Sequence, residues 1–358
     1  LKMPMQAIIT RIAEQEILTR DDAERAMTLI LTGSASNEQI AGFLMGLRAR
    51  GESLDELIGF TSVMRIHAVP VDLPDINPSS GAVGADHALD IVGTGGDGMG
   101  TFNISTATAF VCAGAGALVA KHGNRSVSSK CGSSDVLEEL GVKTTLGKKG
   151  VEYCLREVGL SFIFAPLFHP ALKYVMPVRR ELAVRTCFNI LGPLCNPANV
   201  RHLLVGAFSV EMARTMIEIL AALGASKIIA VHSDEGMDEL SISGPSTVFT
   251  YAGDGIECES VSPAELGLSQ YPIREVIGGD AVQNAEIVSS ILNGSSGAPR
   301  DIVVLNAAFA LLAAEMVSSV SEGLDRATES IDSGNARRRL EHLINASNDA
   351  DTDAPGEE

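Results

Sequence analysis

The sequence predicts an α/β protein in which a small all-helical N-terminal domain precedes a larger α/β domain with a mainly parallel central sheet. Helix-start signals recur through the first seventy residues, and short apolar runs alternate with helical patterns beyond them. The chain has 358 residues. A single core usually stops growing at roughly 250 to 300 residues, so two domains are expected. Aromatic residues make up only 4% of the chain, which suits an aliphatic core of helices packed on a parallel sheet.

Residues 1–75 are predicted to form the helical domain. Apolar residues recur there at helical spacing, so each helix has one apolar face. Three hydroxyl side chains stand three residues before an acidic or amide residue, a spacing typical of helix N-termini. These pairs are Thr19 with Asp22, Ser36 with Gln39, and Ser53 with Glu56. Gly33 and Gly51 act as stop signals, and prolines 70, 74 and 78 predict a linker.

Residues 85–345 are predicted to form the α/β domain. Helices are expected to begin near Ser105, Asp135 and Val210, between five buried strands. The expected strands are 88–92, 118–120, 162–165, 203–207 and 228–232. Strands separated by helices imply a parallel sheet, and ligands of such sheets bind at the carboxyl ends of the strands. Residues 346–358 are predicted to be an acidic, frayed tail.

Charge and composition exclude several classes of partner. The formal net charge of −18 repels polyanions and anionic membranes, so neither nucleic acid nor a membrane is expected as a partner. The six cysteines are scattered without a CxxC pair, and most are expected to be reduced and buried. No signal peptide is recognisable, and Gly or charged residues interrupt the longest apolar runs. We therefore expect a cytoplasmic protein.

The stretch DIVGTGGDGMGTFNIST at 90–106 predicts a phosphate-binding loop. Its five glycines follow a predicted strand directly, and glycine lets successive backbone amides point at one anion. The helix that begins at Ser105 adds further donors. A glycine-rich turn with a purely structural role is the alternative. A P-loop is excluded because no lysine follows at the required position, and the acidic residue expected of a dinucleotide site is missing.

A second loop strengthens the phosphate prediction. The segment KHGNRSVSSKCGSSD at 121–135 concentrates Lys121, Arg125 and Lys130 with five serines after the next predicted strand. Few structural loops need that many donors that suit phosphate.

The acidic segment SDEGMDEL at 233–240 predicts a magnesium site, because it also follows a strand at the ligand edge. Magnesium prefers oxygen ligands and commonly bridges carboxylates to substrate phosphates. A solvated turn is the alternative interpretation. The local sequence does not decide between Asp234 with Glu235 and Asp238 with Glu239.

Six motifs together resemble the anthranilate phosphoribosyltransferase family, and they span most of the chain in that family's order. They are GTGGDG at 93–98, NIST at 103–106, KHGNRSVSS at 121–129, VRRELAVRT at 178–186, NILGPLCNP at 189–197 and MDE at 237–239. The resemblance implies a fold like that of nucleoside phosphorylases and phosphoribosyltransferases. It implies transfer of the 5-phosphoribosyl group of phosphoribosyl diphosphate to the amine of anthranilate, with release of diphosphate, in tryptophan biosynthesis.

The resemblance also implies the site residues. Positions for phosphoribosyl diphosphate are Gly93, Gly96, Asp97, Thr101, Asn103, Ser105, Thr106, Lys121, Ser129 and Ser133. Positions for Mg²⁺ are Ser105, Asp238 and Glu239, and those for anthranilate are His122, Asn124, His169, Arg179, Gly192 and Pro193. A homodimer formed through the helical domain is implied, and helices from about 169–185 are expected to rejoin that domain.

Catalysis is expected to be electrostatic, with Lys121 and Arg179 in binding roles and no strong general base. An aromatic amine loses its proton easily after attack, so the proton goes either to His122 or to solvent. Two positions depart from the family pattern, which more usually has Ser at Cys131 and Gly at Ala183. Activity is expected to survive both changes, and Cys131 is a candidate oxidation-sensitive thiol.

Two other functions compete with this one. A pyrimidine nucleoside phosphorylase shares the architecture but has a different KHS-type glycine loop, whereas this chain has KHGN and VRRE. A non-catalytic nucleic-acid-binding relative would carry a basic surface and lose the acceptor residues. The acidic composition and the retained Arg179 and Asn124 argue against it.

Overall fold

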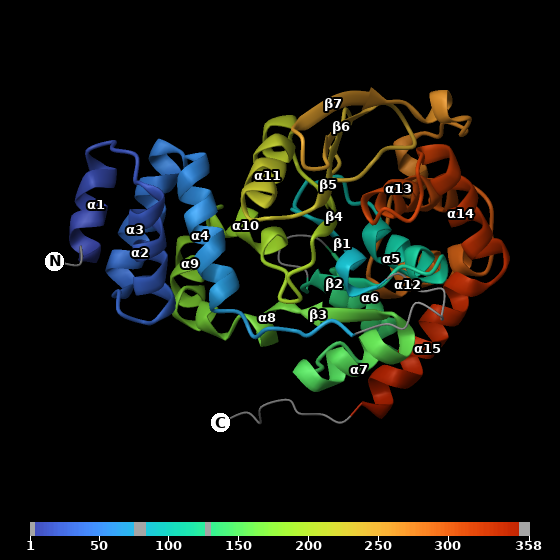
Figure 1. Cartoon of the computed structure of the whole chain (residues 1–358), viewed down its shortest axis with the longest axis horizontal. Coiled ribbons are helices and arrows are strands. Elements are labelled where there is room, and N and C mark those ends of the chain that lie inside the picture. Colours follow the sequence, from blue (N-terminus) through green and yellow to red (C-terminus); the bar gives the residue numbers. More distant parts are fainter. Residues whose placement is uncertain (1–3, 75–83, 126–129, 351–358) are drawn as a thin grey trace.

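The computed structural model describes residues 4–74, 84–125 and 130–350. Figure 1 shows a bundle of helices at one end of the molecule and an α/β unit around a twisted sheet at the other. This arrangement confirms the predicted fold class. The end of the predicted linker and Ser129 lie outside the described residues.

The N-terminal bundle contains α1 (Met5–Ala13), α2 (Arg20–Leu31), α3 (Asn37–Arg50) and α4 (Leu54–Ile66). The three predicted helix starts are confirmed, because Thr19 accepts a hydrogen bond from the Asp22 amide, and Ser36 and Ser53 each form a capping box. In the core of the bundle, the rings of Phe43 and Phe60 pack edge to face.

Glu56 combines helix capping with a buried ion pair. Its carboxylate accepts hydrogen bonds from the backbone amides of Leu18 and Ser53, at 2.9 and 2.8 Å. The Arg50 guanidinium donates to the same carboxylate at 2.6 Å, and both side chains are almost fully buried. The network ties the loop before α2 to the ends of α3 and α4.

A later part of the chain packs against this bundle. The short helix η3 (Pro170–Tyr174) lies against α2, and α9 (Met176–Leu182) lies against α3. The left-handed residue Ala183, with φ of +50°, ends α9. The chain beyond α4 connects the two parts, because the amides of Val69 and Val71 donate to the carbonyls of Phe168 and Pro197.

The sheet has seven strands in the order β3-β2-β1-β4-β5-β6-β7. The first five are β1 (Leu89–Gly93), β2 (Val119–Gly123), β3 (Leu160–Phe164), β4 (His202–Gly206) and β5 (Lys227–Ser233), and they pair in parallel. They correspond to the five predicted strands, with ends shifted by up to three residues. The carboxyl ends of β1, β2, β4 and β5 therefore bring the glycine stretch, the second loop and the acidic segment to one edge.

Two further strands were not predicted. β6 (Ser246–Tyr251) pairs antiparallel with β5, and β7 (Ile256–Val261) pairs antiparallel with β6 at the edge of the sheet. The residues of β7 are mostly exposed, so this strand lacks the apolar run that marks a buried one.

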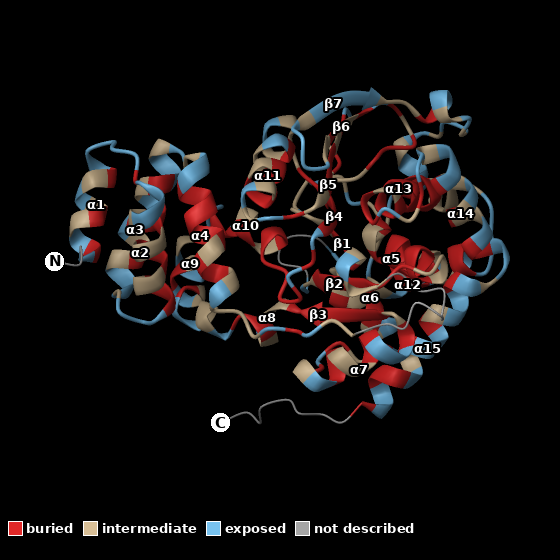
Figure 2. Cartoon of the chain, viewed as in Figure 1, coloured by how far each residue is buried: buried red, intermediate tan, exposed pale blue. Residues whose placement is uncertain are grey.

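Helices cover both faces of the sheet. α11 (Val210–Ala222) packs on β5 and β6, whereas α5 (Ile104–Gly114) and α13 (Ala298–Ala313) lie on the opposite side in Figure 1. Figure 2 shows that buried residues follow the strands and the inner faces of these helices. Helices were expected to begin near Ser105, Asp135 and Val210, and α5, α6 and α11 begin at Ile104, Ser133 and Val210.

The remaining helices fill the outer layers and the loops. They are η2 (Ala85–His87), α6 (Ser133–Glu139), α7 (Lys148–Val158), α8 (Ala165–Phe168), α10 (Phe188–Leu191), η4 (Gly192–Leu194), η5 (Pro263–Leu266), η6 (Ile273–Val276), α12 (Ala281–Leu292), α14 (Val320–Asp332) and α15 (Asn335–Asp349). Within the described residues, none is long and apolar enough to cross a bilayer.

The acidic tail begins later than expected. Residues 346–349 continue α15, and Ala346 and Ser347 are buried. The Ser347 hydroxyl accepts a hydrogen bond from the Lys143 amide at 3.0 Å. Small side chains therefore anchor this turn, although the segment contains no large apolar residue.

Candidate active site

The glycine stretch leaves β1 as a loop of exposed backbone. Gly95, Gly96, Gly98 and Gly100 have φ between +62° and +78°, a region that side chains rarely adopt. Gly93 is needed for a different reason, because a Cβ atom there would come within 2.5 Å of the Asp238 carboxylate. The loop therefore depends on glycine both for its conformation and for the close approach of the acidic segment.

Asp238 joins the acidic segment to the glycine loop. Its carboxylate accepts a hydrogen bond from the Gly95 amide at 2.6 Å, and its own amide donates to the Asp97 carboxylate at 3.4 Å. A Cβ at Gly206, where β4 ends, would lie 1.6 Å from the Asp238 carbonyl oxygen. Two strand-end glycines thus make room for this segment.

The alternative acidic pair lies elsewhere. Asp234 is exposed, and the Glu235 carboxylate faces Gly244, where a Cβ would come within 2.6 Å of it. The geometry therefore favours Asp238 and Glu239 over Asp234 and Glu235 as the acids that face the glycine loop.

The carboxyl groups of Asp238 and Glu239 at this edge of the sheet have raised pKa values. Burial, and next the charge of Asp97, raise the pKa of Asp238 to about 6. Burial and the neighbouring Asp238 raise the pKa of Glu239 well above its usual range. Three carboxylates crowd together here, so the site favours a cation. The donor set of carboxylates beside a serine hydroxyl consists of hard oxygens, and it fits Mg²⁺.

Lys121 brings one positive charge to the same place. It is buried in the middle of β2, and its ammonium group donates to the Ile91 carbonyl at 2.6 Å and to the Ser105 hydroxyl at 3.2 Å. Burial lowers the pKa of Lys121, whereas the charges of Asp90, Glu239 and Asp238 oppose that shift. Lys121 thus links β1 to the first turn of α5.

Other predicted residues lie around the N-terminus of α5. Thr106 is buried, and its hydroxyl has no hydrogen-bond partner among the described residues. Asn103 accepts from the Asn284 side-chain amide at 2.9 Å and donates to the Cys131 carbonyl at 3.4 Å. Thr101 pairs with Ile277 in an isolated bridge. Asn103 therefore connects the glycine loop to the second loop.

The second loop is described at its two ends. Asn124 is exposed, and Ser133 is the first residue of α6. Arg125 forms an ion pair with Glu138 at 2.7 Å, so this cation is already engaged within the protein. Cys131 is buried, and burial raises the pKa of its thiol. The expectation of an oxidation-sensitive Cys131 is therefore wrong, because reactive cysteines need an exposed thiolate.

His122 and His169 form a buried pair of imidazoles. Their ring centroids are 5.2 Å apart, and the Nε2 atom of each lacks a hydrogen-bond partner among the described residues. Burial lowers the pKa of His169 to about 4 and that of His122 well below its usual value. Both rings are therefore neutral at neutral pH.

Arg179 and the turn at Gly192 lie towards the helical bundle. The Arg179 guanidinium stacks over the Phe188 ring at 5.5 Å, and within the described residues it pairs with no carboxylate. Pro193 is buried, whereas the space beside Gly192 is open. Hydrogen bonds thus link Asp238 with Asp97 and Lys121 with Ser105 beside the glycine loop, whereas Arg179 contacts residues near the helical bundle.

Three residues of this region were not predicted. Arg185 donates to the Gly96 carbonyl at 2.7 Å, which ties the segment after α9 to the glycine loop. The buried Asp90 carboxylate accepts from the His122 amide at 3.1 Å and from the Asn196 side chain at 2.7 Å. An aspartate inside the apolar run ALDIV was a signal for Asp90, and Arg185 and Asn196 lie within the motifs VRRELAVRT and NILGPLCNP.

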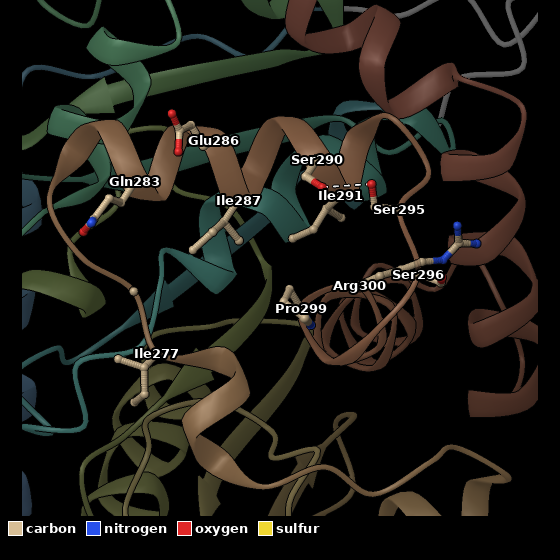
Figure 3. A pocket seen from close by; sticks show the side chains of 11 residues that line it. Ile277, Gln283, Glu286, Ile287, Ser290, Ile291, Ser295, Ser296, Pro299 and Arg300 are labelled. Carbon is tan, nitrogen blue, oxygen red and sulfur yellow. Dashed lines mark hydrogen bonds between the residues drawn. The ribbon is translucent and has the colours of Figure 1, made fainter.

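A separate groove of about 500 Å³ lies between α12 and the start of α13 (Figure 3). Gln283, Glu286 and Ile287 line it from α12, and Pro299 and Arg300 from α13. None of the predicted site residues lines it.

Comparison with known proteins places both parts of the chain in one family. Residues 85–337 match the model of the glycosyl transferase family a/b domain, and residues 6–68 match that of its helical bundle domain. Anthranilate phosphoribosyltransferase from Salinibacter ruber is 49% identical over 97% of this chain and 99% of its own. The corresponding protein from Thermomicrobium roseum is 46% identical over 96% of this chain and 97% of its own.

Solved structures agree with the sequence relatives. Anthranilate phosphoribosyltransferase from Thermus thermophilus has a TM-score of 0.86 and 38% identity, covering 95% of this chain and 99% of its own. The Saccharomyces cerevisiae protein, in complex with PRPP (phosphoribosyl diphosphate) and Mg, has a TM-score of 0.86 and 27% identity, covering 96% and 98%. The chain described here therefore belongs to the anthranilate phosphoribosyltransferase family.

Proposed function

We propose that this chain transfers the 5-phosphoribosyl group of phosphoribosyl diphosphate to the amine of anthranilate, releasing diphosphate, in tryptophan biosynthesis. One observation carries the proposal beyond family membership. The glycine loop, Lys121 and the two adjacent acids Asp238 and Glu239 converge at the carboxyl edge of the sheet. This arrangement suits a polyanion that is bound together with a divalent cation.

The diphosphate is held by the glycine loop and by the start of α5. Gly93 lies at the start of the loop, the backbone amides of Gly96 and of the first turn of α5 supply donors, and Lys121 supplies a positive charge. Asp97, Thr101, Asn103, Thr106, Ser129 and Ser133 complete the proposed contacts with phosphoribosyl diphosphate. Ser105, Asp238 and Glu239 hold Mg²⁺, which when bound neutralises negative charge that develops on the departing diphosphate.

Anthranilate is proposed to bind on the side of the site nearer the helical bundle. Arg179 is the proposed partner of its carboxylate, because a guanidinium without an acidic partner is available for a bidentate contact. The buried, neutral rings of His122 and His169 suit a flat aromatic molecule, and Asn124, Gly192 and Pro193 complete the acceptor site. A neutral His122 is also able to accept the proton that the amine loses.

The helical domain is proposed to comprise residues 1–75 together with 169–185 and to form the interface of a homodimer. Six of the eight large apolar side chains that are exposed among the described residues lie on these segments. They are Ile17, Met45, Leu54, Ile66, Tyr174 and Val184. Sedimentation should give a particle of twice the chain mass. The Ile66 side chain is 75% exposed, so Ile66→Glu would place a charge in the proposed interface and should shift the particle towards the mass of one chain. A monomeric parent chain contradicts this part of the proposal.

The decisive assay follows the loss of anthranilate fluorescence with phosphoribosyl diphosphate and Mg²⁺. Absence of turnover refutes the proposed reaction.

Arg179→Ala should raise KM for anthranilate roughly 10- to 100-fold, because a hydrogen bond to a charged group contributes about 1.5–3 kcal/mol. KM for phosphoribosyl diphosphate should stay unchanged. Arg180→Ala, on the exposed face of the same helix, is the matched control, and equal effects of the two substitutions contradict the role of Arg179.

A further inference from the structure

Three potential metal ligands meet at the amino-terminal edge of the sheet, opposite the candidate active site. They are His87 of η2, His202 at the start of β4 and Glu315 just after α13. The Glu315 carboxylate oxygen lies 3.4 Å from His87 Nδ1 and 3.3 Å from His202 Nε2. All three ligand atoms lie within 4.8 Å of one another.

The contact between His202 Nε2 and Glu315 is a long hydrogen bond of 3.3 Å, and both separations also fit ligands of a shared ion. Charge-assisted hydrogen bonds are typically about 2.7–2.9 Å long. Ligands at about 2.0–2.1 Å from a tetrahedral ion are about 3.3–3.4 Å from each other, which matches the two measured separations. His87 Nδ1 is buried and has no hydrogen-bond partner among the described residues.

The backbone at Glu315 supports a role for its side chain. Glu315 has φ of +57°, and its amide and that of Met316 donate to the carbonyls of Leu312 and Leu311. This pattern ends a helix at a left-handed position where glycine is strongly favoured. A glutamate tolerates the position only at a cost, and its carboxylate points between two imidazoles.

The two imidazoles are arranged as ligands. Their rings stack with centroids 4.9 Å apart. His202 is buried at the start of β4, and imidazole nitrogens are common ligands of metal ions. His202 Nδ1 has no hydrogen-bond partner in the described part of the chain, so a small rotation of the ring meets little resistance.

We propose that His87, His202 and Glu315 bind a divalent transition-metal ion such as Zn²⁺, with water completing its coordination. Two imidazoles and one carboxylate suit Zn²⁺ better than Mg²⁺, which prefers oxygen ligands. The role is structural, because the site lies at the sheet edge away from the proposed substrates. The ion joins η2, which follows the linker between the domains, to β4 and to the end of α13.

Cobalt absorption tests the site in the full chain. Protein stripped with a chelator is titrated with Co²⁺ in excess Mg²⁺, which fills oxygen-rich sites. One equivalent should give the visible absorption of four-coordinate cobalt. Glu315→Gly and His87→Gln should abolish it, whereas Glu329→Gln and His342→Gln, at exposed positions of α14 and α15, should retain it. Absorption that survives in Glu315→Gly and His87→Gln, or that never appears, overturns the proposal.

Thermal unfolding supplies an independent measurement. Zn²⁺ should raise Tm of the wild-type chain and of both controls, but not Tm of Glu315→Gly. Glycine suits the left-handed backbone there, so this variant should fold and keep its turnover of anthranilate. An equal rise of Tm in Glu315→Gly and Glu329→Gln contradicts the site, and so does the absence of any rise in the wild-type chain.

Discussion

The buried His169 predicts a specific loss of stability in mild acid. Its side chain is about 5% exposed, and burial lowers its pKa from 6.5 to about 4. The unfolded chain therefore binds a proton at His169 near pH 6.5, whereas the folded chain binds it only near pH 4. Between these values the unfolded state holds more protons, so the free energy of unfolding falls as the pH falls. Above pH 6.5 the effect disappears.

The size of this effect follows from the shift. Each pKa unit corresponds to about 1.4 kcal/mol, so a shift from 6.5 to about 4 is equivalent to about 3 kcal/mol in total. About 2 kcal/mol of this is lost between pH 7 and pH 5. Substitution His169→Gln removes the titrating group, so the free energy of unfolding of that variant should fall by about 2 kcal/mol less than that of the parent over the same range.

Urea unfolding at pH 7, 6 and 5 measures the difference directly. Comparison between variants cancels the titration of groups remote from His169. The neighbouring His122, whose pKa His169 helps to lower, is removed by repeating the comparison in chains that carry His122→Gln. His342→Gln is the matched control, because this histidine is exposed on α15, and its curve should run parallel to that of the parent chain. Parallel curves for His169→Gln and the parent refute the argument, because they show that His169 binds its proton equally in both states.

Two further predictions concern stability at fixed pH. Ala183→Gly should stabilise the chain by about 1 kcal/mol, because Ala183 has a left-handed backbone that costs a side chain roughly 1–2 kcal/mol; a lower urea midpoint contradicts this. Glu56→Ala should cost about 3–5 kcal/mol, because it leaves the buried Arg50 without its partner. Asp55→Ala, which breaks the exposed pair with Arg20, should cost at most about 1 kcal/mol. Equal losses in the two alanine variants contradict the buried network.

Features that depend on local chemistry could be predicted from the sequence. The capping residues Ser36 and Ser53 act within three residues of themselves, and the parallel strands are marked by apolar runs. β6 and β7 were not predicted. Their pairing is antiparallel, and β7 is largely exposed. β7 therefore shows no continuous apolar pattern, whereas β6 has the run STVFTY of β-branched and aromatic residues, which is typical of a strand.

The candidate site shows the same division between local and distant effects. The glycine loop and Lys121 could be predicted, because each comes directly after a run of apolar residues that marks a strand. The preference for Asp238 over Asp234 depends on Gly206, more than thirty residues earlier in the chain, which has no Cβ to block the approach. Arg185 donates to the carbonyl of Gly96, although the two residues are 89 positions apart in the sequence. Such contacts are set by the packing of whole elements, which the spacing of residues does not reveal.

The strand β7 has a consequence for the protein at high concentration. As the last strand of the sheet it has unpaired backbone groups on one side, which invite strands of other molecules to add. Glu257 and Glu259 are exposed along this strand. Two copies that approach edge to edge therefore bring carboxylates together, and the repulsion opposes fibre-like growth of the sheet.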